Sequence, residues 1–396
     1  MRILVISNDV VPGFGIPVAA PGLRAHGLAL GLRAHGFEVE VAVPADVLAL
    51  ATTATGAAVP PPPPATAVVS PPDLMGHIKA GSFEVVVFIN ANLTPHLAPI
   101  AGVHFVYDMF APKLLERLAS PGAAQSWDDE VALKERALGL ADSIWVNGRR
   151  KLGYALGWVM RPGVERWRVE EFGRSSLFES DPATRLTLVE MPVAPIGGEH
   201  DPLPDPDRGE GSSRRAAVAG YAQAWSALAS VHPCHQAIVD AGHELHALLP
   251  AHWAQGDSAA PVTALPEGVV LNKGPLRFDR FADWVTSMDV MVDVFEPSAE
   301  RRFAMITRSV VALGLGVPVI HGVDSEVADI IEEFDAGWLV IGNDSTRWQE
   351  VAAELKDPMI LARKRSGARR ASAVRFEPSA ALAQAAAELK RIGSGR

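Results

Sequence analysis

A strand, a loop, a helix and a second strand are predicted in turn between Phe295 and His321. In an open parallel sheet, the loop after a strand's carboxyl end and the start of the next helix form the crevice where ligands bind. Glu300, Thr307 and Arg308 fall in that crevice. The planar fork of arginine suits phosphate, and the amides at a helix amino terminus add partial positive charge. The segment therefore predicts an anion site; the alternative is an ordinary surface ion pair between Arg308 and Glu300.

A glycine-rich loop near the amino terminus is a second candidate site. Gly13, Phe14 and Gly15 follow the first apolar strand, and glycines there would let the backbone approach a ligand closely. The alternative is a plain flexible connection. Arg24, at the start of the next helix, could meet a phosphate or carboxylate of an acceptor, or it could be a solvated helix charge. The loop does not match G-x-G-x-x-G, so the sequence gives little support for dinucleotide binding.

Asp108 and the pair Gly220 and Tyr221 also end predicted strands. Asp108 could contact an acceptor hydroxyl or act as a base, and its alternative role is a helix N-cap. Gly220 and Tyr221 could flank a nucleotide, while the alternative for Tyr221 is a side chain at the edge of the core. We therefore expect ligand contacts from both halves of the chain.

Alternating strand and helix patterns predict an α/β protein with two Rossmann-like domains, whose parallel sheets face each other across a cleft. The first domain is predicted over residues 1–194. A linker rich in glycine, proline and charge follows at 195–215, and the second domain is predicted at 216–376. An amphipathic helix at 377–396 is expected to pack back on the body.

Five consecutive prolines, Pro60 to Pro64, lie in the segment from Ala51 to Pro72. Proline removes backbone donors and imposes extended backbone. This segment is therefore predicted to be a surface excursion with some polyproline character.

Composition excludes several classes of protein. The 396 residues are 48% hydrophobic and carry a formal net charge of -10, which argues against a general nucleic-acid binder. A single cysteine, Cys234, rules out an intramolecular disulfide. The sequence shows neither a signal-peptide pattern nor an apolar run long enough to span a membrane. We therefore expect a cytoplasmic protein, without a prediction of its oligomeric state.

Three strings resemble those of known enzymes. The segment Glu300–Pro318 combines Glu, Thr-Arg and Gly-x-Pro, and it resembles the donor region of retaining GT-B glycosyltransferases of sequence family 4. Val106–Leu118 is similar to that group's Asp, aromatic, Pro and Leu-Glu pattern. Ala141–Gly157 looks like its strand, basic turn and aromatic helix. The resemblance therefore touches both domains.

This resemblance implies transfer of a sugar from a nucleotide-sugar donor to a saccharide or small-molecule acceptor, with retention and without a metal or other cofactor. Arg308 and Lys273 would stabilise the leaving diphosphate, with Gly220, Tyr221 and Gly274 also at the donor. Cell-surface polysaccharide or secondary-metabolite synthesis is the expected setting. A sugar-nucleotide epimerase and a non-catalytic GT-B subunit are the alternatives.

One departure from the family pattern concerns the donor ribose. Family members usually carry a carboxylate seven positions before the Gly-x-Pro proline, and many carry another eight positions earlier. Here those positions hold Val311 and Phe303, whose side chains cannot accept a hydrogen bond from a ribose hydroxyl. The basic residue usual after the first strand of the second domain is also missing, and Lys273 is the replacement candidate.

No metal site is predicted. Histidines and the cysteine cluster in one segment, but without a recognised zinc spacing. These residues are His232, Cys234, His235, His243 and His246. Neither a G-x-S-x-G elbow nor a P-loop occurs in the sequence, so hydrolase and P-loop functions have no local support.

Overall fold

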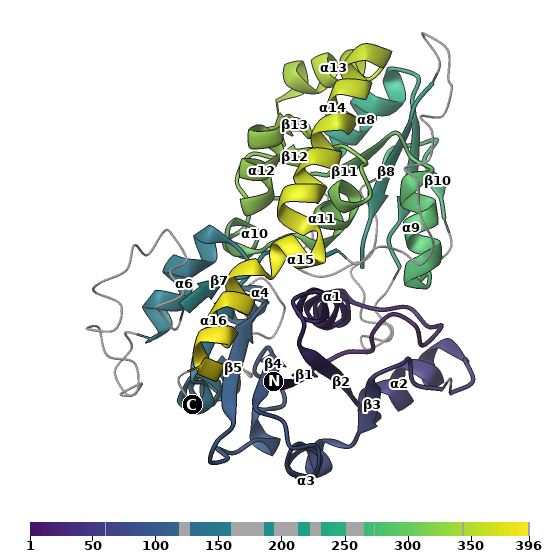
Figure 1. Cartoon of the computed structure of the whole chain (residues 1–396). Coiled ribbons are helices and arrows are strands. Elements are labelled where there is room, and N and C mark those ends of the chain that lie inside the picture. Colours follow the sequence, from purple (N-terminus) through teal and green to yellow (C-terminus); the bar gives the residue numbers. More distant parts are fainter. Residues whose placement is uncertain are drawn as a thin grey trace. The chain divides into compact units, whose positions relative to one another are not determined.

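The computed structural model divides into two compact units, one of Met1–Ala194 with Glu377–Arg396 and one of Pro195–Phe376 (Figure 1). It describes residues 1–59, 61–118, 127–159, 186–193, 213–221, 231–250, 265–272, 274–342 and 344–394.

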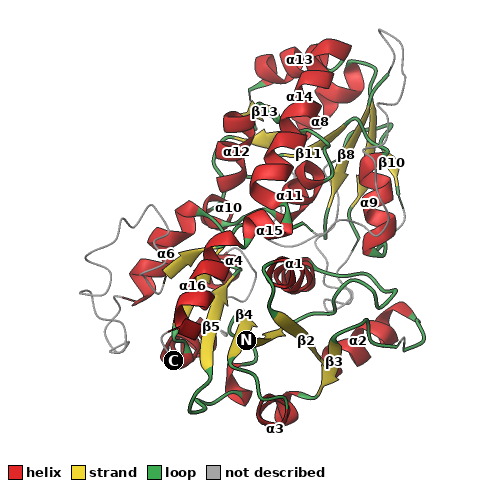
Figure 2. Cartoon of the chain, in the orientation of Figure 1, coloured by secondary structure: helices red, strands yellow, loops and turns green. Residues whose placement is uncertain are grey.

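A parallel sheet forms the centre of unit 1, and its strands are yellow in Figure 2. It has seven strands in the order β3-β2-β1-β4-β5-β6-β7. Its inner strand β4 is buried at every position, as expected when helices cover both faces of a parallel sheet. The strands are β1 Arg2–Ile6, β2 Glu38–Pro44, β3 Thr66–Val69, β4 Val85–Ile89, β5 His104–Met109, β6 Ser143–Val146 and β7 Leu186–Leu188.

The helices of unit 1 lie between successive strands along the chain, as the alternating pattern predicts. They are α1 Ala20–Ala34, α2 Ala45–Thr55, α3 Leu74–Ala80, α4 Lys113–Leu118, α5 Trp127–Leu140 and α6 Arg149–Val159, with 3-10 turns η1 Pro71–Asp73 and η2 Thr94–His96.

The proline-rich segment agrees with the prediction in part. Pro61 to Pro64 lie in a loop and are mostly exposed, but the residues on either side of them form regular structure that was not predicted. Its beginning belongs to α2, and Thr66–Val69 pairs with β2 as the edge strand of the sheet. The edge position explains the difference, because an edge strand needs backbone partners on one side only. Pro63 lies against the glycine loop, since a Cβ added at Gly13 would come within 2.8 Å of the Pro63 ring.

Unit 2 is built on a six-stranded parallel sheet in the order β10-β9-β8-β11-β12-β13. The strands are β8 Arg215–Ala219, β9 Glu244–Leu248, β10 Val270–Leu271, β11 Val290–Asp293, β12 Val319–Gly322 and β13 Gly337–Val340. The helices are α8 His232–Asp240, α9 Phe278–Thr286, α10 Ala299–Phe303, α11 Thr307–Gly314, α12 Glu326–Phe334, α13 Ser345–Glu354 and α14 Pro358–Ala371, with a π-helical turn at Ser372–Phe376.

The last two helices, α15 Pro378–Ala381 and α16 Ala383–Ser394, belong to unit 1. Glu388 anchors α16, because its carboxylate accepts hydrogen bonds from the Trp145 indole and the Thr187 hydroxyl, both at 2.8 Å. Burial raises the pKa of Glu388. Among the described helices, none combines the length and apolar character needed to cross a lipid bilayer.

Close packing of α1 against α15 depends on Gly31. A Cβ at this position would lie 2.3 Å from the carbonyl oxygen of Pro378 and 2.7 Å from Leu382. At Gly139, which is also inside a helix, an added Cβ would meet nothing within 4 Å.

We expect Gly31→Ala to lower the free energy of unfolding of unit 1 by about 1 to 3 kcal/mol, because the new methyl group forces the helices apart. The matched control Gly139→Ala should be neutral or stabilising by up to about 1 kcal/mol, because alanine favours a helix interior. Urea unfolding followed by circular dichroism measures both. Equal effects of the two variants would contradict the role given to Gly31.

Candidate functional site

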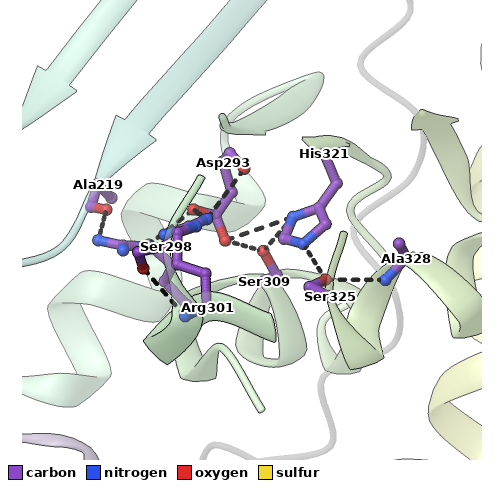
Figure 3. Close-up of polar contacts among 9 residues, drawn as sticks. Ala219, Asp293, Ser298, Arg301, Ser309, His321, Ser325 and Ala328 are labelled. Atoms are coloured by element: carbon purple, nitrogen blue, oxygen red, sulfur yellow. Dashed lines mark hydrogen bonds and ion pairs between the residues drawn. The ribbon is translucent and has the colours of Figure 1, made fainter. Parts of the chain in front are cut away.

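A buried carboxylate, Asp293 at the end of β11, organises the predicted anion site of unit 2 (Figure 3). Arg301 Nη2 and Arg308 Nε each donate to its Oδ1 atom at 3.0 Å. The Ser309 hydroxyl donates to Oδ2, and His321 Nδ1 lies 3.5 Å from the same oxygen. Burial opposes ionisation, but Arg308 and Arg301 outweigh it and hold the pKa of Asp293 well below its usual range.

His321 connects this carboxylate to helix α12. Its Nε2 atom lies 2.6 Å from the hydroxyl of Ser325, which caps α12 by accepting a hydrogen bond from the Ala328 amide at 3.1 Å. Asp293, His321 and Ser325 thus have the residue types of a hydrolytic triad. Asp293 and His321 are fully buried and Ser325 is 2% exposed, so no substrate reaches the serine and the trio is a structural network.

Arg308 and Gly220, both predicted at the donor, lie together. Arg308 Nη1 donates to the carbonyl oxygen of Ala219 at 3.2 Å, and a Cβ at Gly220 would come within 2.3 Å of that nitrogen. Gly220 also has φ +123°, a backbone conformation that favours glycine. Arg308 can therefore reach the carboxyl end of β8 because Gly220 has no side chain.

The surroundings of Arg308 differ from the surface ion pair considered as an alternative. Its side chain is 14% exposed, and its ion-pair partner is Asp293. Thr307 and Arg308 open α11, whose amino terminus has no side-chain cap, and Glu300 lies on the preceding short helix α10. Val311 is 2% exposed and packs in the core, so it presents no group to a ligand.

The other predicted donor residues lie along the same edge of the sheet or outside the described residues. Gly274 lies beside the end of β9, because an added Cβ would come within 2.8 Å of Leu248. Tyr221 directly follows Gly220 and is partly buried. Lys273 lies outside the described residues.

Arg24 and Asp108 of unit 1, which were predicted separately, form one buried ion pair. Arg24 Nη2 and Nε donate to the two carboxylate oxygens of Asp108 at 2.8 and 3.0 Å, and both side chains are fully buried. Arg24 Nη1 also donates to the carbonyl oxygens of Val189 and Glu190. Arg24 is thus not solvated, and the Asp108 carboxylate does not cap a helix. The pair ties α1 and β5 to the chain after β7.

The glycine loop of unit 1 is anchored by Asp9, a residue that the sequence did not single out. Its carboxylate accepts hydrogen bonds from the amides of Val10 and Ala19, which lie at the two ends of the loop. Burial raises the pKa of Asp9 to about 7. Gly13 and Gly15 have φ +104° and +72°, and Phe14 between them is 1% exposed. The glycines serve the loop's own conformation, with the phenyl ring turned into the core.

The residues of the histidine-rich segment have separate environments. His243 bonds the Ala352 carbonyl, His246 the Glu244 carboxylate and Cys234 the Gly342 carbonyl. Among the described residues, no three His, Cys, Asp or Glu side chains are grouped so that they could hold a metal ion.

Breaking the buried pair of unit 1 should be costly. We expect Asp108→Ala to lower the free energy of unfolding by about 3 to 5 kcal/mol, because it leaves the Arg24 cation buried without its partner. The control, Asp279→Ala, removes the exposed partner of Arg277 and should cost no more than about 1 kcal/mol. Denaturant unfolding measures both. A small loss for Asp108→Ala would show that the pair is not needed for folding.

His321 should make unit 2 less stable in acid. Burial lowers its pKa from 6.5 to about 4, so between these values the unfolded chain binds more protons than the folded chain. Its contribution is complete above pH 6.5 and is lost as the pH falls toward 4. We expect His321→Gln to reduce the slope of unfolding free energy against pH in this window by up to about 1.4 kcal/mol per pH unit. Urea titrations at successive pH values test this, and equal slopes would contradict it.

No family model matches the chain, and no curated protein matches its sequence. Solved structures match over nearly its whole length. Sucrose-phosphate synthase from Thermosynechococcus elongatus is 12% identical with a TM-score of 0.67, and the match covers 100% of both chains. Anabaena HepE, solved with UDP and glucose, is 13% identical with a TM-score of 0.62 and coverage of 99% and 100%.

A Listeria monocytogenes protein described as a UDP-N-acetylglucosamine 2-epimerase is also similar. It is 13% identical with a TM-score of 0.52, and the match covers 99% of this chain and 97% of that one. At these identities the likeness shows the fold. Two α/β units with parallel sheets of seven and six strands, matched end to end by GT-B structures, show that this chain has the GT-B fold.

Proposed function

We propose that this protein is a glycosyltransferase that moves a sugar from a nucleotide-sugar donor to a saccharide or small-molecule acceptor, with retention of configuration. The observation that carries the proposal is Arg308 at the uncapped amino terminus of α11, held by Asp293 beside Gly220. The similarity to HepE, solved with UDP and glucose, supports a nucleotide-sugar donor. Polysaccharide or secondary-metabolite synthesis is the proposed setting.

Arg308 has the chemistry that this reaction needs. Transfer creates an oxocarbenium-like sugar and a more negative leaving diphosphate, so a positioned cation stabilises the transition state. One good donor of this kind is worth about 3 to 4 kcal/mol. Asp293 fixes the guanidinium before a ligand arrives, which lowers the reorganisation needed during reaction. No metal is required in this scheme, because arginine supplies the positive charge.

The predicted base for the acceptor's proton does not have the exposure that this role needs. Asp108, the predicted base, is fully buried and bound by Arg24 at both carboxylate oxygens. A retaining transfer in which the acceptor attacks from the side of the leaving diphosphate avoids this requirement, because a diphosphate oxygen assists deprotonation. The glycine loop of unit 1 stays our candidate for acceptor contact.

Two other functions have specific observations in their favour. The likeness to the Listeria protein described as an epimerase supports turnover of a nucleotide sugar without an acceptor. The buried Val311, where the resembled family places a ribose-binding carboxylate, supports a non-catalytic subunit.

Isothermal titration calorimetry with UDP-, GDP- and TDP-sugars, followed by nucleotide-release assays, separates these functions. A transferase binds one donor and releases its nucleoside diphosphate faster with an acceptor present. Binding without turnover favours the subunit, and release or interconversion that needs no acceptor favours the epimerase. Failure of every sugar nucleotide to bind would overturn the donor site.

Arg308→Lys should lower nucleotide release by about 100-fold or more, because an ammonium group cannot contact Asp293 and the ligand as a planar fork does. The control is Arg302→Lys on α10, whose 60% exposed side chain pairs with Asp324. It should release nucleotide at the normal rate. Equal rates for the two variants would remove Arg308 from the reaction.

A further inference from the structure

Arg301 differs from the neighbouring arginine of the same short helix. Both look like exposed helix charges in the sequence, and Arg302 is one. The Arg301 side chain is 9% exposed and turns toward Asp293, as Figure 3 shows. Burying an arginine costs free energy unless the charge is paired. A charge that served only solubility would lie on the surface, so the inward position of Arg301 indicates another role.

Arg301 and Arg308 are neighbours because one atom holds both. Their guanidinium groups donate to the same Oδ1 of Asp293, each at 3.0 Å. Both also lie over the ring of Phe295, with their central carbons 4.7 and 4.2 Å from its centroid. The carboxylate and the ring hold two like charges side by side, an arrangement that their mutual repulsion opposes.

Each of these arginines keeps hydrogen-bonding capacity. A guanidinium has five N–H donors. Arg301 donates to Asp293 through Nη2. Arg308 donates to Asp293 through Nε and to the Ala219 carbonyl through Nη1. Within the described ranges of the chain, Arg301 Nε and Nη1 and Arg308 Nη2 have no hydrogen-bond partner. None of the three is among the buried atoms that lack one, so they remain accessible to a ligand.

We propose that Arg301 is the second cation of the donor site and binds, together with Arg308, the diphosphate of the nucleotide sugar. This inference rests on the proposed function for the ligand's identity. Two guanidinium groups with N–H donors left over match the two phosphoryl groups of a diphosphate, one guanidinium for each. The uncapped amino terminus of α11 adds backbone amides on the Arg308 side. In this arrangement α10 supplies the charge that the resembled family takes from a loop after its first donor-domain strand.

Inorganic pyrophosphate and orthophosphate, titrated into the full-length protein by calorimetry, test the pair without a nucleotide. We expect wild-type protein to prefer pyrophosphate, because it alone can engage both arginines at once. Arg301→Gln should weaken pyrophosphate binding by about tenfold or more and remove most of this preference. Arg302→Gln, the control on the same helix, should change neither.

Three further measurements keep the outcome decisive. Arg301→Lys is the substitute if Arg301→Gln proves unstable in thermal unfolding. It retains the charge and should therefore recover part of the affinity for pyrophosphate. Lys273→Gln tests the competing cation, and a loss of pyrophosphate binding in that variant alone would assign the second charge to Lys273 and overturn our assignment. UDP titration of the same variants should show the loss seen with pyrophosphate.

The inference and the proposed function fail separately. Sugar-nucleotide binding that is equal in Arg301→Gln and Arg302→Gln would overturn the inference while the function stands. Pyrophosphate binding that depends on both arginines, in a protein that binds no sugar nucleotide, would keep the two-cation site and overturn the function. Binding of neither pyrophosphate nor any nucleotide by wild-type protein would overturn both.

Discussion

Desolvation of charge is the constraint on which this structure depends. An ionised carboxylate inside a protein loses its hydration, so it stays charged only where cations and hydrogen-bond donors replace water. Asp293 meets this condition with Arg301, Arg308 and Ser309, and Asp108 meets it with Arg24. In both units the carboxylate lies at the carboxyl end of a parallel strand. Unit 2 differs because Arg301 and Arg308 keep N–H groups without a partner among the described residues, whereas three nitrogens of Arg24 bond to the protein itself.

The sequence predicts the order of elements well, because buried parallel strands and amphipathic helices leave different hydrophobic patterns. The strands near Val85, His104 and Gly337 lie where their apolar runs indicate. The proline-rich segment was predicted only in part: Pro61 to Pro64 lie in a mostly exposed loop, but the edge strand after them was missed. Proline's missing amide excludes a central strand, but an edge strand such as Thr66–Val69 can begin directly after it.

Side-chain partners across the fold could not be predicted in the same way. Arg24 and Asp108 were both singled out, but they are 84 residues apart, and only the packing of α1 against the sheet brings them together. Asp293 was missed because it interrupts an apolar strand, where one acidic residue has no periodic signal. A carboxylate inside such a run, followed by nearby arginines, is a sign that could have been used, because burial demands a partner. The proximity of Gly220 and Arg308 was consistent with the predicted donor site, although ligand contact itself stays a prediction.

Helices α15 and α16 belong to unit 1 but follow unit 2 in the chain. This connectivity sets the order in which the two units can finish folding during synthesis. Residues of unit 2 emerge from the ribosome before Glu388, whose carboxylate joins Trp145 and Thr187. The first unit to be synthesised is therefore the last that can finish folding, although domains usually mature from the amino terminus onward. Until α15 has been synthesised, the surface of α1 around Gly31 stays uncovered on the nascent chain. The core of unit 1 is complete only when α15 and α16 have packed onto it.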